Sequence, residues 1–167
     1  MTEQDPKKVV FVCTGNVFRS LTAEFSSRAA HEQDNKPSLK MAFESAGTRG
    51  RAAKPVRDDV KAYAGALGLD VSLHESRLLT QDIMDSADLI IAMDSTHKKF
   101  ISDNFGYDAP LYLEIAEGKA EDLLDLPDVM PDFKDRPAEA EVFIHGVMNR
   151  INGNREQFLA NLPKFMK

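Results

Sequence analysis

The chain has 167 residues, of which 43% are hydrophobic and 29% charged, and its 27 acidic and 21 basic side chains give a formal net charge of −6 at pH 7. This length suits one domain with a single hydrophobic core, and the composition excludes a disordered or membrane-embedded chain. The excess of acidic groups repels polyanions, which argues against nucleic acid as a partner.

The N-terminal segment, MTEQDPKK, has neither the basic region nor the apolar region of a secretion signal. No later apolar run approaches the roughly 20 residues that a membrane-spanning helix needs. We therefore expect a cytoplasmic protein that has no membrane partner.

Short apolar runs alternate with segments of helical pattern along the chain. The runs predict strands at residues 8–12, 38–47, 88–94 and 109–113. The helical patterns predict helices at residues 20–33, 54–69, 80–87, 95–105 and 138–162, the last with an interruption at Asn152 and Gly153. This alternation predicts an α/β fold, a single domain over residues 1–167 with a four-stranded parallel sheet that carries helices on both faces.

An acidic segment, residues 117–137, separates the last predicted strand from the terminal helix. Prolines at positions 127, 131 and 137 interrupt any regular pattern in it. Irregular segments of about twenty residues in a compact domain usually serve a function or are disordered. We expect this segment to contribute to a functional site.

The only cysteine stands directly after the first predicted strand, and an arginine follows six residues later at the start of a predicted helix. Ligands of parallel α/β sheets bind beyond the carboxyl ends of the strands, so Cys13 and Arg19 occupy a ligand position. Successive backbone N–H groups of such a loop can surround a phosphate dianion, and Gly15 and Asn16 tolerate the left-handed backbone angles that this requires. We expect the phosphate-binding loop to comprise Thr14, Gly15, Asn16, Val17, Phe18, Arg19 and Ser20.

The same surroundings suit a nucleophile. A helix N-terminus and a nearby arginine favour the thiolate form of a cysteine. The planar guanidinium of Arg19 can bind two phosphate oxygens, which a lysine cannot do, and Ser20 can donate a hydrogen bond to the thiolate. These residues predict attack by Cys13 on a phosphomonoester, giving a phosphocysteine that water hydrolyses. The alternative for a cysteine after a strand is a small buried thiol with no chemical role.

The stretch VCTGNVFRS, residues 12–20, resembles the active-site signature of the low-molecular-weight protein tyrosine phosphatases. Similar segments follow in the family's order: ESAGTRG at 44–50, LGLDVSLHESRLLT at 67–80 and ADLIIAMDSTH at 87–97. The resemblance implies the flavodoxin-like, phosphotyrosine protein phosphatase I-like fold and a phosphatase that needs no metal or other cofactor. In it, Cys13 is the nucleophile and Arg19 binds the phosphate and stabilises the transition state.

The departing oxygen of a phosphate ester needs a proton, which a nearby carboxyl group usually supplies. The acidic segment offers the candidates Asp122, Asp125, Asp128, Asp132 and Asp135. The resemblance places the family's acid at Asp128, although Val129 follows it where the family has proline. Asp125 and Asp132 remain open as alternatives.

The resemblance also implies a hydrogen-bond network beneath the phosphate loop, formed by Asn16, Ser20, Ser45 and His74. Such a loop is strained and needs fixed partners. The remaining histidines, His31, His97 and His145, have no metal-ligand spacing, and we expect them to be surface or core residues. Asp94 follows the third predicted strand, where we expect it to cap a helix.

The expected substrate is a phosphorylated protein or a small aryl phosphate, and inorganic phosphate or vanadate should bind as ligands. Family members often place aromatic residues after the acid, whereas Met130 and Pro131 stand there in this chain. Val17 resembles the tyrosine-specific members, because arginine-phosphate phosphatases of this fold tend to have threonine at that position. Arg49, Arg51 and Lys54 could form a basic rim that guides anions. We expect a monomer or weak dimer.

Two alternative functions are compatible with the same loop. One is an arsenate reductase that uses an external small thiol, because arsenate has the shape and charge of phosphate and the chain has one cysteine. The other is a non-catalytic phosphate-binding module, which the altered Asp-Pro region would allow.

Overall fold

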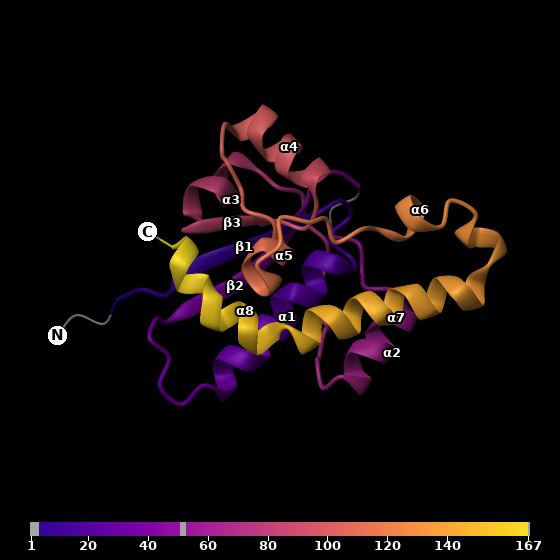
Figure 1. Cartoon of the computed structure of the whole chain (residues 1–167), viewed down its shortest axis with the longest axis horizontal. Helices are drawn as coiled ribbons and strands as arrows, with labels where there is room; N and C mark the ends of the chain where they lie inside the picture. The colour runs from indigo at the N-terminus through magenta and orange to yellow at the C-terminus, as the bar shows by residue number, and fades with distance from the viewer. Residues whose placement is uncertain (1–3, 51–52, 167) are drawn as a thin grey trace.

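The computed structural model describes residues 4–50 and 53–166 (Figure 1). Arg51 of the expected basic rim lies outside these residues. Three parallel strands form the sheet, with β1 (Lys7–Cys13) between β2 (Met41–Gly47) and β3 (Leu89–Ala92). Val9 is level with Phe43 on one side and with Leu89 on the other. The strands that follow β1 in the sequence pair with it on opposite sides, β2 on one side and β3 on the other. The loop after β1 therefore lies at the switch point where ligands bind in such sheets.

The expected fourth strand, residues 109–113, is not part of the sheet. Leu111 forms one isolated parallel bridge with Ala92, and the carbonyl oxygen of Pro110 accepts the N–H of Ala92 at 2.9 Å. Helix α5 (Tyr112–Glu117) begins at the next residue, so the ladder cannot continue. The prediction of four strands was therefore wrong, and that of a parallel α/β sheet was right.

Helices cover the sheet on both faces, as predicted. The remaining helical elements are α1 (Arg19–Gln33), α2 (Asp58–Ala66), α3 (Gln81–Ser86), α4 (Ser95–Phe105), α6 (Leu126–Val129), η1 (Phe133–Asp135), α7 (Pro137–Gly153), α8 (Arg155–Asn161) and η2 (Leu162–Phe165). The side chains of β1 alternate between two cores: Val9 and Phe11 pack under α1, α5, α7 and α8, whereas Val10 and Val12 pack under α3 and α4 (Figure 1).

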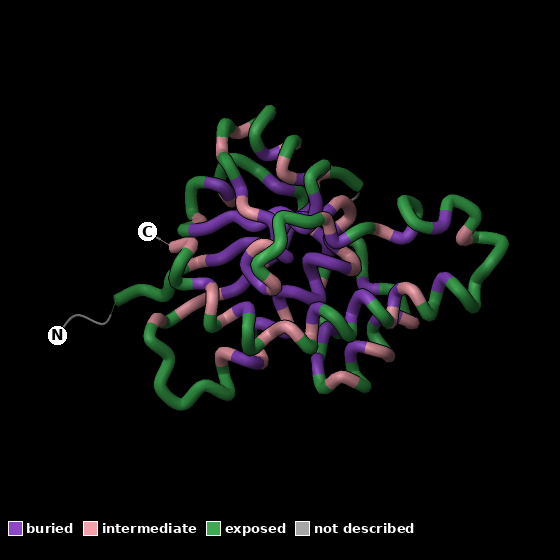
Figure 2. Tube along the Cα trace, viewed as in Figure 1, coloured by how far each residue is buried: buried purple, intermediate pink, exposed green. Residues whose placement is uncertain are grey.

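The sheet is the most deeply buried part of the fold (Figure 2). Residues Val9 to Val12 are all 0% exposed. Phe11 contacts the rings of Phe43 at 6.2 Å and Phe158 at 5.4 Å between centroids. Each fully buried side chain of this kind contributes roughly 1.5–3 kcal/mol to stability. This packing fixes the end of β1, from which the phosphate loop starts.

The residue types at the predicted helix ends were partly right as signals. Threonine is a favoured N-cap residue, and Thr80 at the start of the predicted helix 80–87 caps α3 by accepting the N–H of Ile83 at 3.2 Å. Glycine often ends a helix, and Gly106 after the predicted helix 95–105 ends α4 with a left-handed φ of 65°. The terminal helix is divided between α7 and α8 close to the predicted interruption. The helix predicted at residues 54–69 would place Pro55 in its first turn, and this start is wrong because α2 begins three residues after Pro55.

The terminal helix shows one further difference. The apolar pattern of residues 138–162 predicts that Val142 faces the core, and this prediction is wrong because Val142 is 73% exposed. Across the described residues, no helix combines the length and apolarity that crossing a membrane requires.

Candidate functional site

The loop from Cys13 to Arg19 joins the central strand to α1. Cys13 is the last residue of β1 and is 3% exposed. Asn16 adopts a left-handed φ of 56°, which asparagine tolerates better than most residues. At the end of β2, a Cβ on Gly47 would lie 2.6 Å from the Thr14 carbonyl oxygen. Position 47 must therefore be glycine for the loop to lie against the strand.

The loop is held by hydrogen bonds beneath it. The sulfur of Cys13 lies 2.9 Å from the Ser20 hydroxyl oxygen, and the backbone N–H of Asn16 points to the same sulfur at 3.3 Å. The Asn16 side-chain Nδ2 donates to the hydroxyls of Ser20 at 3.0 Å and Ser45 at 2.8 Å. The Asn16 carbonyl oxygen lies 2.8 Å from Nε2 of His74. The four residues expected beneath the loop thus come together there.

Two members of this network were not expected. Glu24 accepts the Ser45 hydroxyl at 2.6 Å, and the backbone N–H of Arg77 donates to Oδ1 of Asn16 at 3.0 Å. The position of Glu24 three residues after buried Leu21 on the same helix could have signalled an inward-facing carboxylate. The contact of Arg77 with Asn16 is made by a backbone N–H, so the residue type at position 77 could not have indicated it.

Arg19 is fixed by three groups from two parts of the chain. Its side chain is 2% exposed, and Nη1 donates to Oδ2 of Asp94 at 2.7 Å and to the carbonyl oxygen of Leu123 at 2.6 Å. Nη2 lies 3.5 Å from Oδ2 of Asp125. The guanidinium therefore lies in a set plane at the start of α1, where the helix dipole also attracts anions.

Asp94 has two tasks, of which only one was expected. Oδ1 caps α4 by accepting the N–H groups of Thr96 and His97, which confirms the predicted cap. Oδ2 holds Arg19. Burial raises the pKa of Asp94, but the hydrogen bonds from Thr96 and Arg19 outweigh it and hold the pKa below its usual value. Asp94 thus stays ionised beside the arginine.

His97 is a site residue that the sequence analysis missed. Its ring is 1% exposed, its Nδ1 accepts the backbone N–H of Asp94 at 3.2 Å, and its Nε2 lies 2.8 Å from Oγ1 of Thr14. Burial lowers its pKa to about 4, while Asp94 opposes and Arg19 reinforces this shift. The ring is therefore neutral at neutral pH, and because Nδ1 accepts, Nε2 carries the proton and donates to Thr14.

The low pKa of His97 predicts a pH dependence of stability. Since the pKa lies at about 4 in place of 6.5, the native state is stabilised above about pH 6.5 and loses this contribution as the pH falls towards 4. The full loss corresponds to about 3 kcal/mol in the free energy of unfolding. Urea titrations of wild type and His97→Gln at about pH 7 and about pH 4 measure it. A loss as large in the variant as in wild type would contradict this assignment.

The three candidate acids occupy different places. Asp125 caps α6, and its side chain is 34% exposed and faces Arg19. Asp128 lies in the same short helix, is exposed, and accepts the backbone N–H of Asp125 at 3.2 Å. Asp132 is exposed and pairs with Arg136 at 3.3 Å. Asp125 and Asp128 both line the hollow beside Arg19, and Asp132 does not.

Two adjoining hollows open at the loop. A pocket of about 280 Å³ contains Cys13 and has walls formed by Val17, Phe18, Val60, Phe133 and Ile144. The second, of about 350 Å³, is lined by Arg19, Arg49 and Asp128 among others. No aromatic residue directly follows the candidate acid Asp128, yet Phe133 of η1 lines the pocket. The pocket has the apolar walls that an aromatic ring requires.

The family model for low molecular weight phosphotyrosine protein phosphatase matches residues 8–166. A protein-arginine-phosphatase of Bacillus subtilis is 37% identical over 100 residues, covering 59% of this chain and 63% of the relative. A low molecular weight protein-tyrosine-phosphatase of Streptomyces coelicolor is 39% identical over 94 residues, covering 54% of each. The chain thus spans between about half and two thirds of the length of these relatives.

Solved structures share the fold. A YwlE mutant from Bacillus subtilis aligns with a TM-score of 0.78 at 24% identity, covering 94% of this chain and 99% of the other. A low molecular weight protein tyrosine phosphatase from T. tengcongensis aligns with a TM-score of 0.73 at 24% identity, covering 96% and 99%. At this identity the likeness establishes the arrangement of strands and helices.

Proposed function

This chain belongs to the low molecular weight phosphotyrosine protein phosphatase family, and from that membership we propose that it hydrolyses phosphomonoesters through a phosphocysteine formed at Cys13. One observation carries the proposal. The sulfur lies beneath a loop whose Asn16 N–H points at it at 3.3 Å, with the Ser20 hydroxyl 2.9 Å away and Arg19 held rigidly at the loop's end. This is an anion cradle with a nucleophile at its base.

In the proposed reaction, the loop N–H groups and Arg19 bind the phosphate oxygens in line with the sulfur. The sulfur–phosphorus bond forms as the bond from phosphorus to the leaving oxygen breaks, and Asp128 gives that oxygen its proton. Water then attacks the phosphocysteine, Asp128 takes a proton from it, and inorganic phosphate leaves. Fixed donors directed at the developing charge account for most of the acceleration in such sites.

The walls of the pocket favour an aryl phosphate. Phe18, Phe133 and Val60 line the pocket, so the ring of a phosphotyrosine can pack against apolar side chains there. The proposed substrate is therefore phosphotyrosine in a protein. The tyrosine phosphatases among the matching relatives support this choice, and so does Val17 at the loop position discussed above.

A protein-arginine-phosphatase among the relatives makes phosphoarginine the second candidate substrate. Two peptides of one sequence, one with phosphotyrosine and one with phosphoarginine, separate the candidates by their kcat/KM values. We expect wild type to prefer phosphotyrosine and Val17→Thr to shift the ratio towards phosphoarginine. A preference of wild type for phosphoarginine would overturn the choice of substrate but not the phosphocysteine.

The basic experiment measures hydrolysis of para-nitrophenyl phosphate in the presence of EDTA, followed by acid quenching and mass spectrometry. Activity should resist EDTA, and the trapped phosphate should sit on the only cysteine. No turnover with vanadate still bound would support a phosphate-binding module. Arsenate-dependent consumption of a small thiol without ester hydrolysis would support the reductase.

The assignment of the acid predicts a dependence on the leaving group. Asp128→Asn should reduce kcat/KM for phosphotyrosine by roughly 10²-fold and for para-nitrophenyl phosphate by much less, because kcat/KM reports formation of the phosphocysteine and nitrophenolate leaves without needing a proton. Asp125→Asn should raise KM for both substrates similarly, since Asp125 contacts Arg19. Asp132→Asn is the matched control and should behave as wild type. If the leaving-group dependence belongs to Asp125→Asn, Asp125 is the acid.

A further inference from the structure

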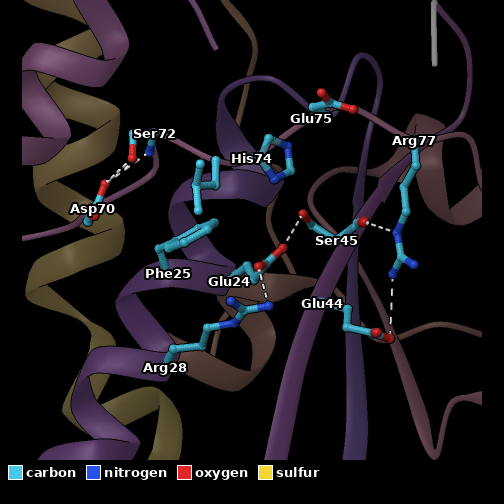
Figure 3. Close-up of a pocket in the computed structure, with 11 residues that line it drawn as sticks. Glu24, Phe25, Arg28, Glu44, Ser45, Asp70, Ser72, His74, Glu75 and Arg77 are labelled. Atoms are coloured by element: carbon cyan, nitrogen blue, oxygen red, sulfur yellow. Dashed lines mark hydrogen bonds and ion pairs between the residues drawn. The ribbon is translucent and has the colours of Figure 1, made fainter. Parts of the chain in front are cut away.

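A cavity of about 410 Å³ shares no lining residue with the pocket that contains Cys13 (Figure 3). Helix α1 contributes Glu24 and Arg28 to it, strand β2 contributes Glu44 and Ser45, and the segment 70–77 closes it. Figure 3 shows the carboxylate of Glu24 pointing at the Ser45 hydroxyl. Nothing in the proposed reaction uses this cavity directly.

Glu24 is an unusual residue for the inner face of a helix. It is 4% exposed, and buried carboxylates are rare unless their charge is used. Oε1 accepts the Ser45 hydroxyl at 2.6 Å, and Oε2 accepts Nη2 of Arg28 at 2.7 Å. Burial raises the pKa of Glu24 above its ordinary value, and the hydrogen bond from Ser45 and the charge of Arg28 offset this only in part.

When Glu24 is ionised, the donors and acceptors between Glu24 and Cys13 can be assigned in only one way. An ionised carboxylate only accepts, so Ser45 spends its single proton on Glu24 and accepts from Asn16. The Arg77 N–H donates to Oδ1 of Asn16, so the Asn16 amide nitrogen faces the two serines.

Ser20 is the last residue before Cys13 in this series of hydrogen bonds. Its hydroxyl oxygen accepts one N–H of Asn16, which leaves its single proton for the sulfur of Cys13 at 2.9 Å. The sulfur then accepts from both Ser20 and the Asn16 backbone. A sulfur that accepts two hydrogen bonds is stabilised as the thiolate.

We propose that Glu24 is a positioning residue whose carboxylate fixes the direction of the hydrogen bonds through Ser45, Asn16 and Ser20, so that Ser20 donates to the sulfur of Cys13. The inference deepens the proposed function and rests on it, since it concerns the reactive form of the same nucleophile. It has a readout of its own, because the reaction of a single cysteine with iodoacetamide reports the thiolate without any turnover.

The test variant is Glu24→Gln. Arg28 donates to one oxygen of Glu24, so the amide oxygen of a glutamine will face Arg28 and its NH₂ group will face Ser45. The Ser45 hydroxyl then loses its acceptor, and the chain to Ser20 weakens. We expect alkylation of Cys13 at about pH 6 to slow by roughly fivefold, as for hydrogen bonds that lose a charged partner.

Glu44→Gln is the matched control. Glu44 lines the same cavity, but its carboxylate pairs with Lys8 and Arg77 and does not contact Ser45. Removing a negative charge near a thiol by itself favours the thiolate. A purely electrostatic role of Glu24 would therefore make both variants react as fast as wild type or faster. The proposal requires opposite behaviour: slower alkylation in Glu24→Gln only.

Stability and coupling complete the test. Because burial disfavours the charged form of Glu24, Glu24→Gln should melt at the same temperature as wild type or higher, which separates lost reactivity from lost structure. Ser45→Ala should also slow alkylation, and adding Glu24→Gln to it should have no further effect. Additive effects, or alkylation of Glu24→Gln at the wild-type rate, would overturn the proposal. If the protein lacks phosphatase activity while these alkylation results hold, only the proposed function fails.

Discussion

Replacing Cys13 with serine should reduce hydrolysis of para-nitrophenyl phosphate by at least about 10⁴-fold. A serine hydroxyl must lose its proton to attack phosphorus, and a general base has to take it. The groups that contact the sulfur are the Ser20 hydroxyl and the Asn16 backbone N–H, and neither is a base. The serine in the variant would therefore remain protonated and unreactive.

The same variant should keep its ligand site. Isothermal titration with vanadate or inorganic phosphate should give binding to Cys13→Ser close to that of wild type, because the loop and Arg19 are unchanged. Loss of binding together with activity would point to a damaged loop. Activity above about 1% of wild type would show that the sulfur is not the nucleophile.

Replacing Arg19 with lysine should lower kcat/KM by roughly 10³-fold, although the charge is kept. The guanidinium contacts Asp94 and the Leu123 carbonyl through one nitrogen and faces Asp125 through another. An ammonium group cannot make these contacts and still present a planar pair of donors to phosphate. Asp94 would also lose its buried partner, so the melting temperature should fall.

A suitable control is Arg150→Lys. Arg150 also binds a carboxylate through two nitrogens, at 2.8 Å each to Glu117, but it lies on α7 away from the phosphate loop. It should leave kcat/KM near the wild-type value. Steady-state kinetics and thermal melts of both variants measure the comparison. Activity of Arg19→Lys within tenfold of wild type would contradict the role proposed for the guanidinium.

The sequence predicted the parts of the fold that depend on local pattern. The apolar runs at β1, β2 and β3 and the cap residues Thr80 and Asp94 were recognisable because strand burial and helix capping use neighbouring residues. The prediction of a strand at residues 109–113 was wrong because this run is divided between two environments. Leu111 forms a single bridge to the sheet, whereas Leu113 lies in α5. Buried helix and buried strand have the same apolar composition over so short a run.

In the candidate site, too, the residues that are neighbours in the sequence could be predicted, and those brought in by packing could not. The loop from Cys13 to Ser20 is continuous in the chain, so its order and spacing could be recognised. Asp94 and His97 lie together at the start of α4, Glu24 lies on α1, and each had a sufficient local explanation as a cap, a lone histidine or a helix charge. Only packing shows that these three side chains reach the loop, as it does for Phe133 in the pocket wall.

The wall that Phe18 forms beside Cys13 has a consequence for life under oxidative stress. Peroxide converts a reactive thiolate to a sulfenic acid, which a neighbouring thiol can trap as a disulfide before irreversible oxidation follows. These 167 residues hold one cysteine, and Phe18, which lines the pocket beside Cys13, cannot form that bond. For the nucleophile proposed at Cys13 we therefore expect repair to depend on reductants from the surroundings, so that the supply of small thiols sets how long the proposed activity lasts.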